Sequence, residues 1–510
     1  MNNKRKVRVR FAPSPTGPLH IGGVRTALYN YLFAKKNNGD FILRIEDTDQ
    51  TRFVPGAEEY IIEALQWCGI RPNEGVGFGD GEYKPYRQSE RKPMYRQYAE
   101  QLVKDGHAYY AFDSSEELEE ARLRMEKSGG SFMYNAITRQ NMKNSLSLSH
   151  DEVQKKIDLG EHYTVRIKIP RNEEIRLQDI IRGWVVVHSS QMDDKVLFKS
   201  DGMPTYHLAN VVDDYTMKIT HVIRGEEWLP SAPLHVLLYR YLGWENAMPE
   251  FAHLPLLLRP DGNGKLSKRD GDRLGFPVFP LNWIDPTTKE LSSGYCEKGY
   301  FPEAFINMLV LLGWHPSGNK ELFSLEELVK EFSLDRVSKH GAKFDPEKIK
   351  WFNQQYLRTK SDEELSKEFQ KSESRIQNQN FEYVKKVCSL IKEKATFVNE
   401  FWSLGSYFFE EPQNYDAEVI KKRWNEKTKN FITELAKAYQ SENNFSSANS
   451  ENVFKQTCEK LGIKTGEVMQ LFRVCISGVA GGPALFEVAS LLGKDKVIKR
   501  LETAANTIKP

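Results

Sequence analysis

The sequence predicts an α/β protein whose second part is all helical. A strand, a helix and a second strand follow one another within about the first 45 residues, the order of a βαβ unit in a parallel sheet. Strand and helix patterns return further along, before residue 250. After residue 345 only helical patterns with recognisable start signals follow. A chain of 510 residues is long enough for roughly two to four domains.

The amino-terminal βαβ unit rests on hydrophobic periodicity. Apolar residues alternate with basic ones over 7–11, and the prolines of 13–18 then end the strand. From Gly22 apolar residues recur with the spacing of one helix face, and 37–39 closes the helix. A second strand over 41–45 leads into an acidic run. The residues that mark the helix face are Val24, Ala27, Leu28, Tyr31 and Leu32.

Residues 91–201 have a different texture and are interpreted as an insertion. Charged helical stretches and short strands mix there, before the α/β pattern resumes. The elements predicted for the insertion and the resumed pattern are a helix over 116–127, strands over 163–169, 184–188 and 219–223, and a helix over 231–241.

Helix starts are the clearest signals in the later part of the chain. Ser324 with Glu327, and Ser361 with Glu364, fit capping boxes, in which each side chain accepts a hydrogen bond from the other residue's backbone N–H. Pro346 is predicted at the first position of a helix, where its missing N–H costs nothing.

Composition excludes several classes of protein. The 72 Lys and Arg nearly balance the 70 Asp and Glu, so a polyanion would have to bind a local patch. The basic start leads into a strand pattern without the apolar core of a secretory signal, and no apolar run suggests a membrane span. The five cysteines are widely spaced, which favours reduced thiols in a cytoplasmic protein.

Two separated loops carry the chemistry. In 13–23, PSPTGPLHIGG, glycines at a helix start let backbone N–H groups face a phosphate, and His20 can donate to the same anion. The alternative is a proline-rich turn with a capping histidine. In 261–269, DGNGKLSKR, three cationic side chains follow a glycine-rich turn and could clamp a triphosphate. The alternative there is a solvated basic loop.

Together, in this order, the two loops resemble the paired HIGH and KMSKS signatures of class I aminoacyl-tRNA synthetases. The chain is similar to the glutamyl-tRNA synthetase family in particular. The further segments that carry this resemblance are RFAPSPTG at 10–17, RIEDTD at 44–49, YHLANVVDD at 206–214, RGEEW at 224–228 and LLGK at 491–494.

The resemblance implies an ATP-dependent enzyme that attaches L-glutamate to tRNA through a glutamyl-adenylate. Arginine suits the two substrate carboxylates because its planar fork bonds them bidentately and stays charged. The family's roles fall on the following residues. Glutamate binding is implied for Arg10, Ala12, Ser14, Glu46, Tyr206, Asn210 and Arg224; ATP binding for Gly17, His20, Gly22, Glu227, Trp228, Leu258 and Lys268; and catalysis for His20, Lys265 and Lys268.

The family's architecture is expected as well. A Rossmann-type catalytic domain would comprise 1–90 and 202–250, interrupted by an acceptor-end-binding insertion over 91–201. A stem-contact region with the second loop would span 251–345, and a helical anticodon-binding domain 346–510. We expect Mg²⁺ to accompany the ATP, tRNA to be the partner, and the enzyme to be a cytoplasmic monomer.

Three features depart from the family pattern. The first signature ends in Gly23 in place of a second histidine, so only His20 takes a catalytic role. No cysteine lies between 69 and 295, which excludes the thiolate zinc site that some relatives hold in the insertion, and no metal site is expected. The stretch 270–300 is longer than usual and is predicted to be a packed excursion.

Other interpretations remain at this stage. A glutaminyl-type synthetase fits less well because of the acidic run after Ile45 and the helical second half. A truncated relative that modifies tRNA bases would lack the helical half. A non-catalytic tRNA-binding paralogue need not keep the charged set above. Lys421, Lys422 and Arg423 beside Trp424 suggest a basic, stacking surface for RNA, or else a solvated helix face.

Overall fold

The computed structural model describes residues 5–509, apart from the side chains of residues 268, 269 and 272. The chain divides into two compact units. The first comprises the chain up to Lys298 together with Pro302–Pro346, and the second comprises Gly299–Phe301 and Glu347–Pro510. The division therefore falls where the sequence changes from an α/β pattern to helices alone.

The predicted βαβ unit is confirmed. Strand β1 (Arg8–Phe11) pairs in parallel with β2 (Asp40–Leu43), and helix α1 (Ile21–Lys36) connects them. The face of α1 predicted to be apolar buries Val24, Ala27 and Leu28. A short third strand, β3 (Glu74–Gly75), pairs in parallel with β2, and helix α2 (Ala57–Trp67) lies between them in the sequence.

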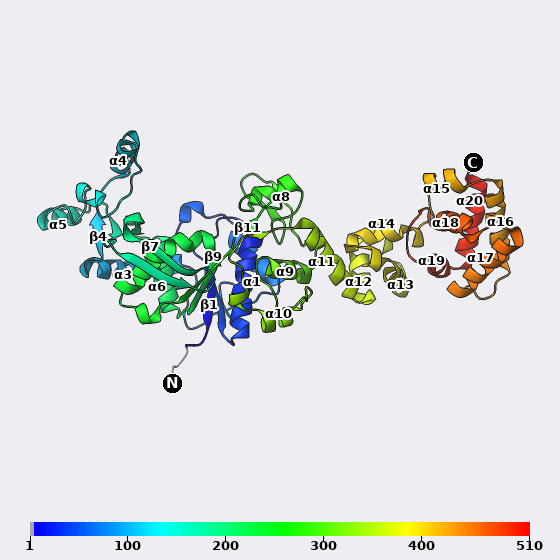
Figure 1. Cartoon of the computed structure of the whole chain (residues 1–510), viewed down its shortest axis with the longest axis horizontal. Helices are drawn as coiled ribbons and strands as arrows, with labels where there is room; N and C mark the ends of the chain where they lie inside the picture. Colours follow the sequence, from blue (N-terminus) through cyan, green and yellow to red (C-terminus); the bar gives the residue numbers. More distant parts are fainter. Residues whose placement is uncertain (1–4, 510) are drawn as a thin grey trace. The chain divides into compact units, whose positions relative to one another are not determined.

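A second set of strands lies against the first. Strand β9 (His221–Gly225), helix α7 (Ala232–Tyr241) and strand β10 (Glu250–Leu254) form another parallel βαβ unit. The N–H of Thr220, just before β9, donates to the Arg8 carbonyl at 2.8 Å, so β9 runs beside β1 (Figure 1). Each βαβ unit continues away from this junction, and ligands of such sheets bind outside the strands' carboxyl ends where the order reverses.

The segment predicted as an insertion contributes to two sheets. Its own three-stranded antiparallel sheet has the order β4-β5-β8, while β6 and β7 extend the catalytic sheet through β10, in the order β7-β6-β10-β9. The proposed boundaries at 201 and 250 stay a prediction. Strand β10 contains residue 250, and its pairing with β6 joins residues that lie on either side of both boundaries. The elements are α3 (Lys92–Lys104), β4 (Ala108–Ala111), α4 (Ser115–Lys127), α5 (His150–Asp158), β5 (Thr164–Ile167), β6 (Glu174–Asp179), β7 (Gly183–His188), β8 (Val196–Phe198) and α6 (Tyr206–Thr216).

The rest of the first unit packs against helices α1 and α2. The Tyr29 hydroxyl of α1 donates to the Val310 carbonyl, within α9, at 2.9 Å. In the long stretch 270–300, Trp283 packs edge-on against Tyr60 with ring centroids 5.3 Å apart, as expected for a packed excursion. The elements are β11 (Leu257–Leu258), α8 (Lys268–Leu274), β12 (Trp283–Ile284), β13 (Leu291–Ser292), α9 (Pro302–Leu311), α10 (Leu325–Glu331) and β14 (Ala342–Lys343).

The second unit contains helices and, within its described residues, no strand. The capping box of Ser361 and Glu364 forms as predicted, and so does that of Ser324 and Glu327 in the first unit. The helices are α11 (Pro346–Thr359, whose first residue belongs to the first unit), α12 (Asp362–Ser372), α13 (Phe381–Ile391), α14 (Phe401–Gly405), α15 (Ala417–Arg423), α16 (Glu426–Gln440), α17 (Ser447–Leu461), α18 (Thr465–Ser477), α19 (Leu485–Leu492) and α20 (Lys494–Thr507).

One interpretation of the helical half is wrong. The Trp424 side chain is only 6% exposed, so it offers no stacking surface to RNA. Arg423 donates to the backbone carbonyls of Gly466 and Glu467, which ties α15 to the start of α18. Trp424 is next to the basic residues in the sequence, but it follows the end of α15 and its side chain is buried in the core.

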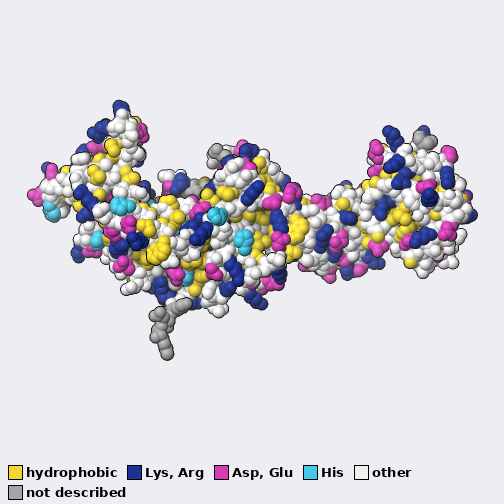
Figure 2. All heavy atoms as spheres, in the orientation of Figure 1, with side chains coloured by type: hydrophobic (Ala, Val, Ile, Leu, Met, Phe, Trp, Pro, Cys, Tyr) yellow, Lys and Arg dark blue, Asp and Glu magenta, His cyan; other side chains and the backbone are white. Residues whose placement is uncertain are grey.

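The surface agrees with the nearly neutral charge of the chain. Figure 2 shows Lys and Arg side chains interspersed with Asp and Glu on the viewed face. Among the described residues, no helix is long and apolar enough to cross a membrane.

Candidate active site

A cleft of about 630 Å³ opens at the carboxyl ends of β1 and β9. Residues from the loop after β1, from the start of α1, from α6 and from the turn after β9 line it. The position follows from the sheet, because the two βαβ units diverge at this edge. Of the residues expected to serve in function, those that line the cleft are Arg10, Ala12, Ser14, Gly17, His20, Gly22, Glu46, Tyr206, Asn210, Arg224, Glu227, Trp228 and Lys265.

Two of the expected residues are not among those lining the cleft. Leu258 lies in β11 beside the second loop, where a β-bridge joins it to Lys265. The backbone of Lys268 begins α8, but its side chain lies outside the described part of the structure. The roles of both residues stay predictions.

The start of α1 combines both interpretations of the first loop. His20 caps the helix, because its Nδ1 accepts the Gly22 N–H at 2.9 Å. The proton of the neutral ring is then on Nε2, which makes that nitrogen a donor. A Cβ at position 22 would lie 2.7 Å from the His20 ring, so this capping geometry requires glycine. The Val278 carbonyl, from the long stretch after α8, accepts the N–H of Ile21 at 3.0 Å.

Arg10, Glu46 and Asn210 come together at one wall of the cleft. Arg10 donates through Nε to Asp214 Oδ1 at 3.0 Å, and Glu46 Oε1 accepts from Asn210 Nδ2 at 3.0 Å. All three side chains are buried, with at most 8% exposed. Tyr206 and Asn210 lie four residues apart on α6, as predicted.

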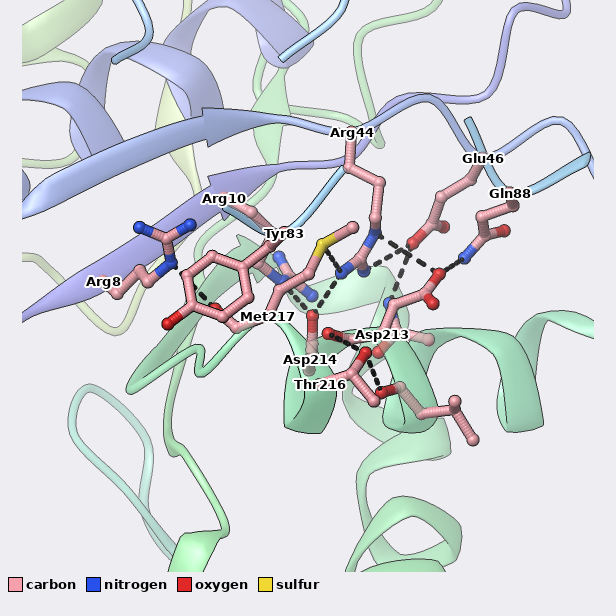
Figure 3. Close-up of polar contacts among 12 residues, drawn as sticks. Arg8, Arg10, Arg44, Glu46, Tyr83, Gln88, Asp213, Asp214, Thr216 and Met217 are labelled. Carbon is pink, nitrogen blue, oxygen red and sulfur yellow. Dashed lines mark hydrogen bonds and ion pairs between the residues drawn. The ribbon is translucent and has the colours of Figure 1, made fainter. Parts of the chain in front are cut away.

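A buried arginine that sequence reasoning gave no role holds this wall together. Arg44, at the end of β2, is fully buried and donates to Asp214 Oδ1 at 2.8 Å and to Glu46 Oε1 at 3.0 Å (Figure 3). Asp214 thus bridges Arg44 and Arg10. The neighbouring Asp213 accepts from Arg91, Gln88 and Tyr95. The three arginines and the three carboxylates balance in charge, as burial requires.

The pKa directions reflect this balance. Burial alone would raise the pKa of Asp214, but the charges of Arg10 and Arg44 and their hydrogen bonds lower it. Burial also raises the pKa of Glu46, and here it outweighs the opposing effect of Arg44 and Arg10. A cation placed next to Glu46 would therefore stabilise its ionised form.

A second wall of the cleft is built on Arg224 at the end of β9. Its Nη1 donates to the Tyr206 hydroxyl at 2.7 Å and its Nη2 to the Trp228 carbonyl at 3.3 Å. Its Nε donates to His253 Nε2 at 3.1 Å. The Tyr206 and Trp228 rings pack at 4.5 Å between centroids.

The second loop faces the same cleft. Lys265 Nζ forms an ion pair with Glu227 Oε1 at 2.8 Å, and both side chains are about half exposed. Burial would raise the pKa of Glu227, but the hydrogen bond from Lys265 lowers it. Asp270 caps the start of α8 and accepts from Ser267, which fixes the end of the loop.

Sequence reasoning missed several residues of the site. Arg44 stands in a segment that was singled out, yet its partners on α6 are distant in sequence. Arg25 of α1 lines the cleft and donates to the carbonyls of Leu312 and Pro255. Val278 lines it from a stretch without an assigned role. Among the described residues, no group of three or more His, Cys, Asp or Glu is placed to hold a metal ion.

Comparison with family models defines the class of protein. The model for tRNA synthetases class I (E and Q), catalytic domain, matches residues 6–351, and the model for an anticodon binding domain matches residues 353–505. A Rossmann-type catalytic part and a helical anticodon part, with this cleft in the former, define a class I aminoacyl-tRNA synthetase of the glutamate and glutamine group.

Individual relatives narrow the class. The chain is 54% identical over 513 residues to the glutamate–tRNA ligase of Cytophaga hutchinsonii, covering 99% of this chain and 98% of that one. It is 55% identical over 508 residues to that of Christiangramia forsetii, with 99% of each covered. The crystal structure of a glutamate tRNA ligase from Elizabethkingia meningosepticum in complex with its amino acid matches with a TM-score of 0.95 at 51% identity, over 99% of this chain and 100% of that one. The chain belongs to the glutamate–tRNA ligase family.

The buried charge network makes a stability prediction. Asp214→Asn keeps the shape of the side chain but leaves Arg10 and Arg44 sharing a neutral partner. We expect the free energy of unfolding of the first unit to fall by about 3–5 kcal/mol, the usual effect of breaking a buried ion pair. Urea unfolding followed by circular dichroism measures this.

Glu100→Gln is the matched control, because its ion pair with Arg96 is solvent-exposed, with side-chain exposures of 52% and 62%. It should cost less than about 1 kcal/mol. Equal losses in the two variants would contradict a structural role for the buried network.

Proposed function

We propose that the cleft binds glutamate between its two arginine walls. Arg10 and Arg224 pair with the substrate's two carboxylates, and Glu46 receives the ammonium. Three contacts of Arg224 use one N–H each, so two of its five N–H groups remain for a carboxylate. Ala12, Ser14, Tyr206 and Asn210 complete the pocket.

The two arginines also explain the choice between glutamate and glutamine. A buried guanidinium opposite a carboxylate is compensated in charge, whereas an amide would leave it desolvated and uncompensated. The single observation that carries the proposal is this placement of two buried arginines and one buried carboxylate around one cleft. The enzyme of this family is a glutamate–tRNA ligase, which charges tRNA with glutamate at the expense of ATP.

We place the nucleotide across the start of α1 and the second loop. ATP, with its Mg²⁺ as part of the substrate, lies with its phosphates near His20, Gly17 and Gly22. Glu227, Trp228 and Leu258 frame the adenine. The orientation of His20 supports this arrangement, because a ring held through Nδ1 donates from Nε2.

The chemistry needs no protein nucleophile. An oxygen of glutamate's α-carboxylate attacks the α-phosphorus of ATP in line, and the bond from that phosphorus to pyrophosphate breaks. Negative charge grows on the phosphate oxygens, so Lys265 and Lys268 stabilise the transition state more than the ground state. Glu227 holds Lys265 at the edge of the cleft until the phosphates compete for it. A ribose hydroxyl of the tRNA's terminal adenosine then attacks the adenylate carbonyl, and AMP leaves.

The insertion and the helical unit would hold the tRNA. In the helical unit, Arg473 of α18 is half-buried and interacts electrostatically with Tyr407. The buried Tyr407 hydroxyl has no hydrogen-bond partner in the part of the chain that the structure describes, and burial raises its pKa to about 12. A Cβ at Gly482 would come within 3.1 Å of Arg473 Nη1. We propose that this cluster, replacing the incorrect Trp424 surface, contacts the anticodon.

The cellular setting is also a proposal. The free cysteines Cys68, Cys388, Cys458 and Cys475 are buried, which suits a reducing cytoplasm. We propose that the enzyme acts as a monomer, and light scattering of the purified chain measures this.

The first functional prediction concerns Arg10 and Arg224, the two arginines proposed to bind glutamate. Arg10→Ala or Arg224→Ala should weaken glutamate binding by about 2–5 kcal/mol, because each leaves a substrate carboxylate unpaired in a desolvated site. The KM for glutamate in aminoacylation should rise in both variants. Arg96→Ala, on the exposed face of α3, serves as the control. An unchanged KM for glutamate in both would remove these arginines from the pocket.

The second concerns the cationic loop. Lys265→Ala and Lys268→Ala should each lower kcat by about 100-fold or more, as removal of a donor to developing transition-state charge does. The KM for glutamate should change little. Single-turnover formation of the adenylate is the measurement. A normal kcat with a raised glutamate KM would show that the lysines bind the amino acid.

The third concerns the helical unit. Arg473→Ala should raise the KM for tRNA about tenfold, the effect of losing one charge-assisted hydrogen bond. The KM values for glutamate and ATP should not change. Lys496→Ala on α20 is a control. Equal tRNA affinity in the parent and Arg473→Ala would place the anticodon contact elsewhere.

A further inference from the structure

Three buried polar groups from adjacent strands form a line that ends at Arg224. Asp179 ends β6, His253 lies in β10 and Arg224 lies in β9. His253 and Arg224 are direct partners in the parallel register. His253 Nδ1 lies 2.6 Å from Asp179 Oδ2, and the Arg224 Nε lies 3.1 Å from His253 Nε2. Their exposures are 1% for Asp179, 0% for His253 and 5% for Arg224.

The hydrogen bonds allow only one tautomer of His253. The Nε of arginine is always a donor, so His253 Nε2 must accept and the ring proton must be on Nδ1. Asp179 Oδ2 accepts that proton. Its other oxygen accepts the backbone N–H groups of Ile181 and Arg182 at 2.9 and 2.8 Å, which fixes the carboxylate. Asp179 thus fixes the tautomer of His253, so that the ring presents an acceptor nitrogen to Arg224.

We propose that Asp179 and His253 are positioning residues that orient the Arg224 guanidinium toward the substrate carboxylate. This inference rests on the proposed glutamate-binding role of Arg224. Holding Nε fixes the plane of the guanidinium, and its terminal nitrogens then face Tyr206 and the cleft. Burial lowers the pKa of His253 although its hydrogen bond to Asp179 opposes this, so the ring stays neutral and able to accept.

Asp179 also connects Arg224 to a different segment of the chain. It comes from the segment expected to bind the acceptor end, and its neighbour Arg182 donates to the His253 carbonyl at 3.2 Å. The segment between the halves of the catalytic domain therefore supplies part of the support of the amino-acid pocket.

Two substitutions at His253 separate positioning from structure. In His253→Asn, the amide takes the place of Nδ1, so a donor to Asp179 remains but the acceptor for Arg224 is lost. In His253→Gln, the amide oxygen takes the place of Nε2 and can still accept from Arg224. Both remove one buried hydrogen bond, so their effects on folding should be similar.

Asp179→Asn tests the tautomer with an isosteric change. The N–H groups of Ile181 and Arg182 hold the amide oxygen on the Oδ1 side, so the amide nitrogen faces His253 Nδ1. The backbone N–H of His253, which bonds both carboxylate oxygens of Asp179, keeps only the Oδ1 side as its acceptor at 3.3 Å. His253 Nδ1 then becomes the acceptor, and the proton of the histidine ring moves to Nε2. There it would point at the Arg224 Nε–H, and two donors would face each other.

The experiment is aminoacylation by the full-length chain with saturating tRNA, measuring the KM for glutamate and for ATP and kcat. His253→Asn and Asp179→Asn should raise the KM for glutamate about tenfold or more, the typical effect of disturbing a group that orients a binding residue. Loss of uniform binding raises KM while kcat stays near the parent value. His253→Gln should stay within about threefold of the parent. The KM for ATP should not change in any variant.

Arg224→Ala distinguishes the two proposals. If it leaves the KM for glutamate unchanged, the assigned role of Arg224 is wrong. If it raises that KM while His253→Asn and Asp179→Asn do not, the positioning proposal alone is overturned. Equal rises in His253→Asn and His253→Gln, or a parallel rise in the KM for ATP, would also overturn it, because a merely structural role predicts that pattern. Urea unfolding of each variant accompanies the kinetics.

Discussion

The buried ion pairs of Arg44 constrain the rest of the site. A guanidinium taken fully out of water needs compensating carboxylates and hydrogen bonds, and Arg44 finds them in Asp214 and Glu46. Those carboxylates come from α6 and from the loop after β2. Arg44 therefore fastens the carboxyl end of one strand to a helix that follows the insertion. Arg10 joins the same network through Asp214. The network therefore fixes the positions of Arg10 and Glu46 in this wall of the cleft.

The fold places the other wall by the same kind of constraint. Arg224 leaves the end of β9 and is held from behind by His253, one strand away. Two buried, braced arginines thus line the cleft, while Lys265 of the second loop is about half exposed and pairs with Glu227. This contrast suits the proposed chemistry, in which the arginines discriminate between amino acids and Lys265 responds to charge that develops on the phosphates during the reaction.

The sequence was sufficient for features that depend on local pattern. The first βαβ unit and the capped helices were predictable because periodicity and capping act within a few residues, whereas the cleft-lining motifs were predicted from the family resemblance. Arg44 and Asp179 could not be assigned, since their partners come from distant strands and helices. Trp424 was misinterpreted because a run of residue types does not reveal which side chains the tertiary structure buries. The extra strands β6 and β7 were unforeseen parts of the catalytic sheet, because strand pairing is set by tertiary structure.

The central claim is that Asp214 acts on glutamate through Arg10 and not independently. A double-mutant cycle on the KM for glutamate tests it, using Asp214→Asn, Arg10→Ala and the two together. Residues that act through one another show coupling, whereas independent residues add. We expect the double variant to lose less than the sum of the two single losses, because Asp214 and Arg10 belong to one network. A double variant whose loss equals the sum of the two single losses would contradict it.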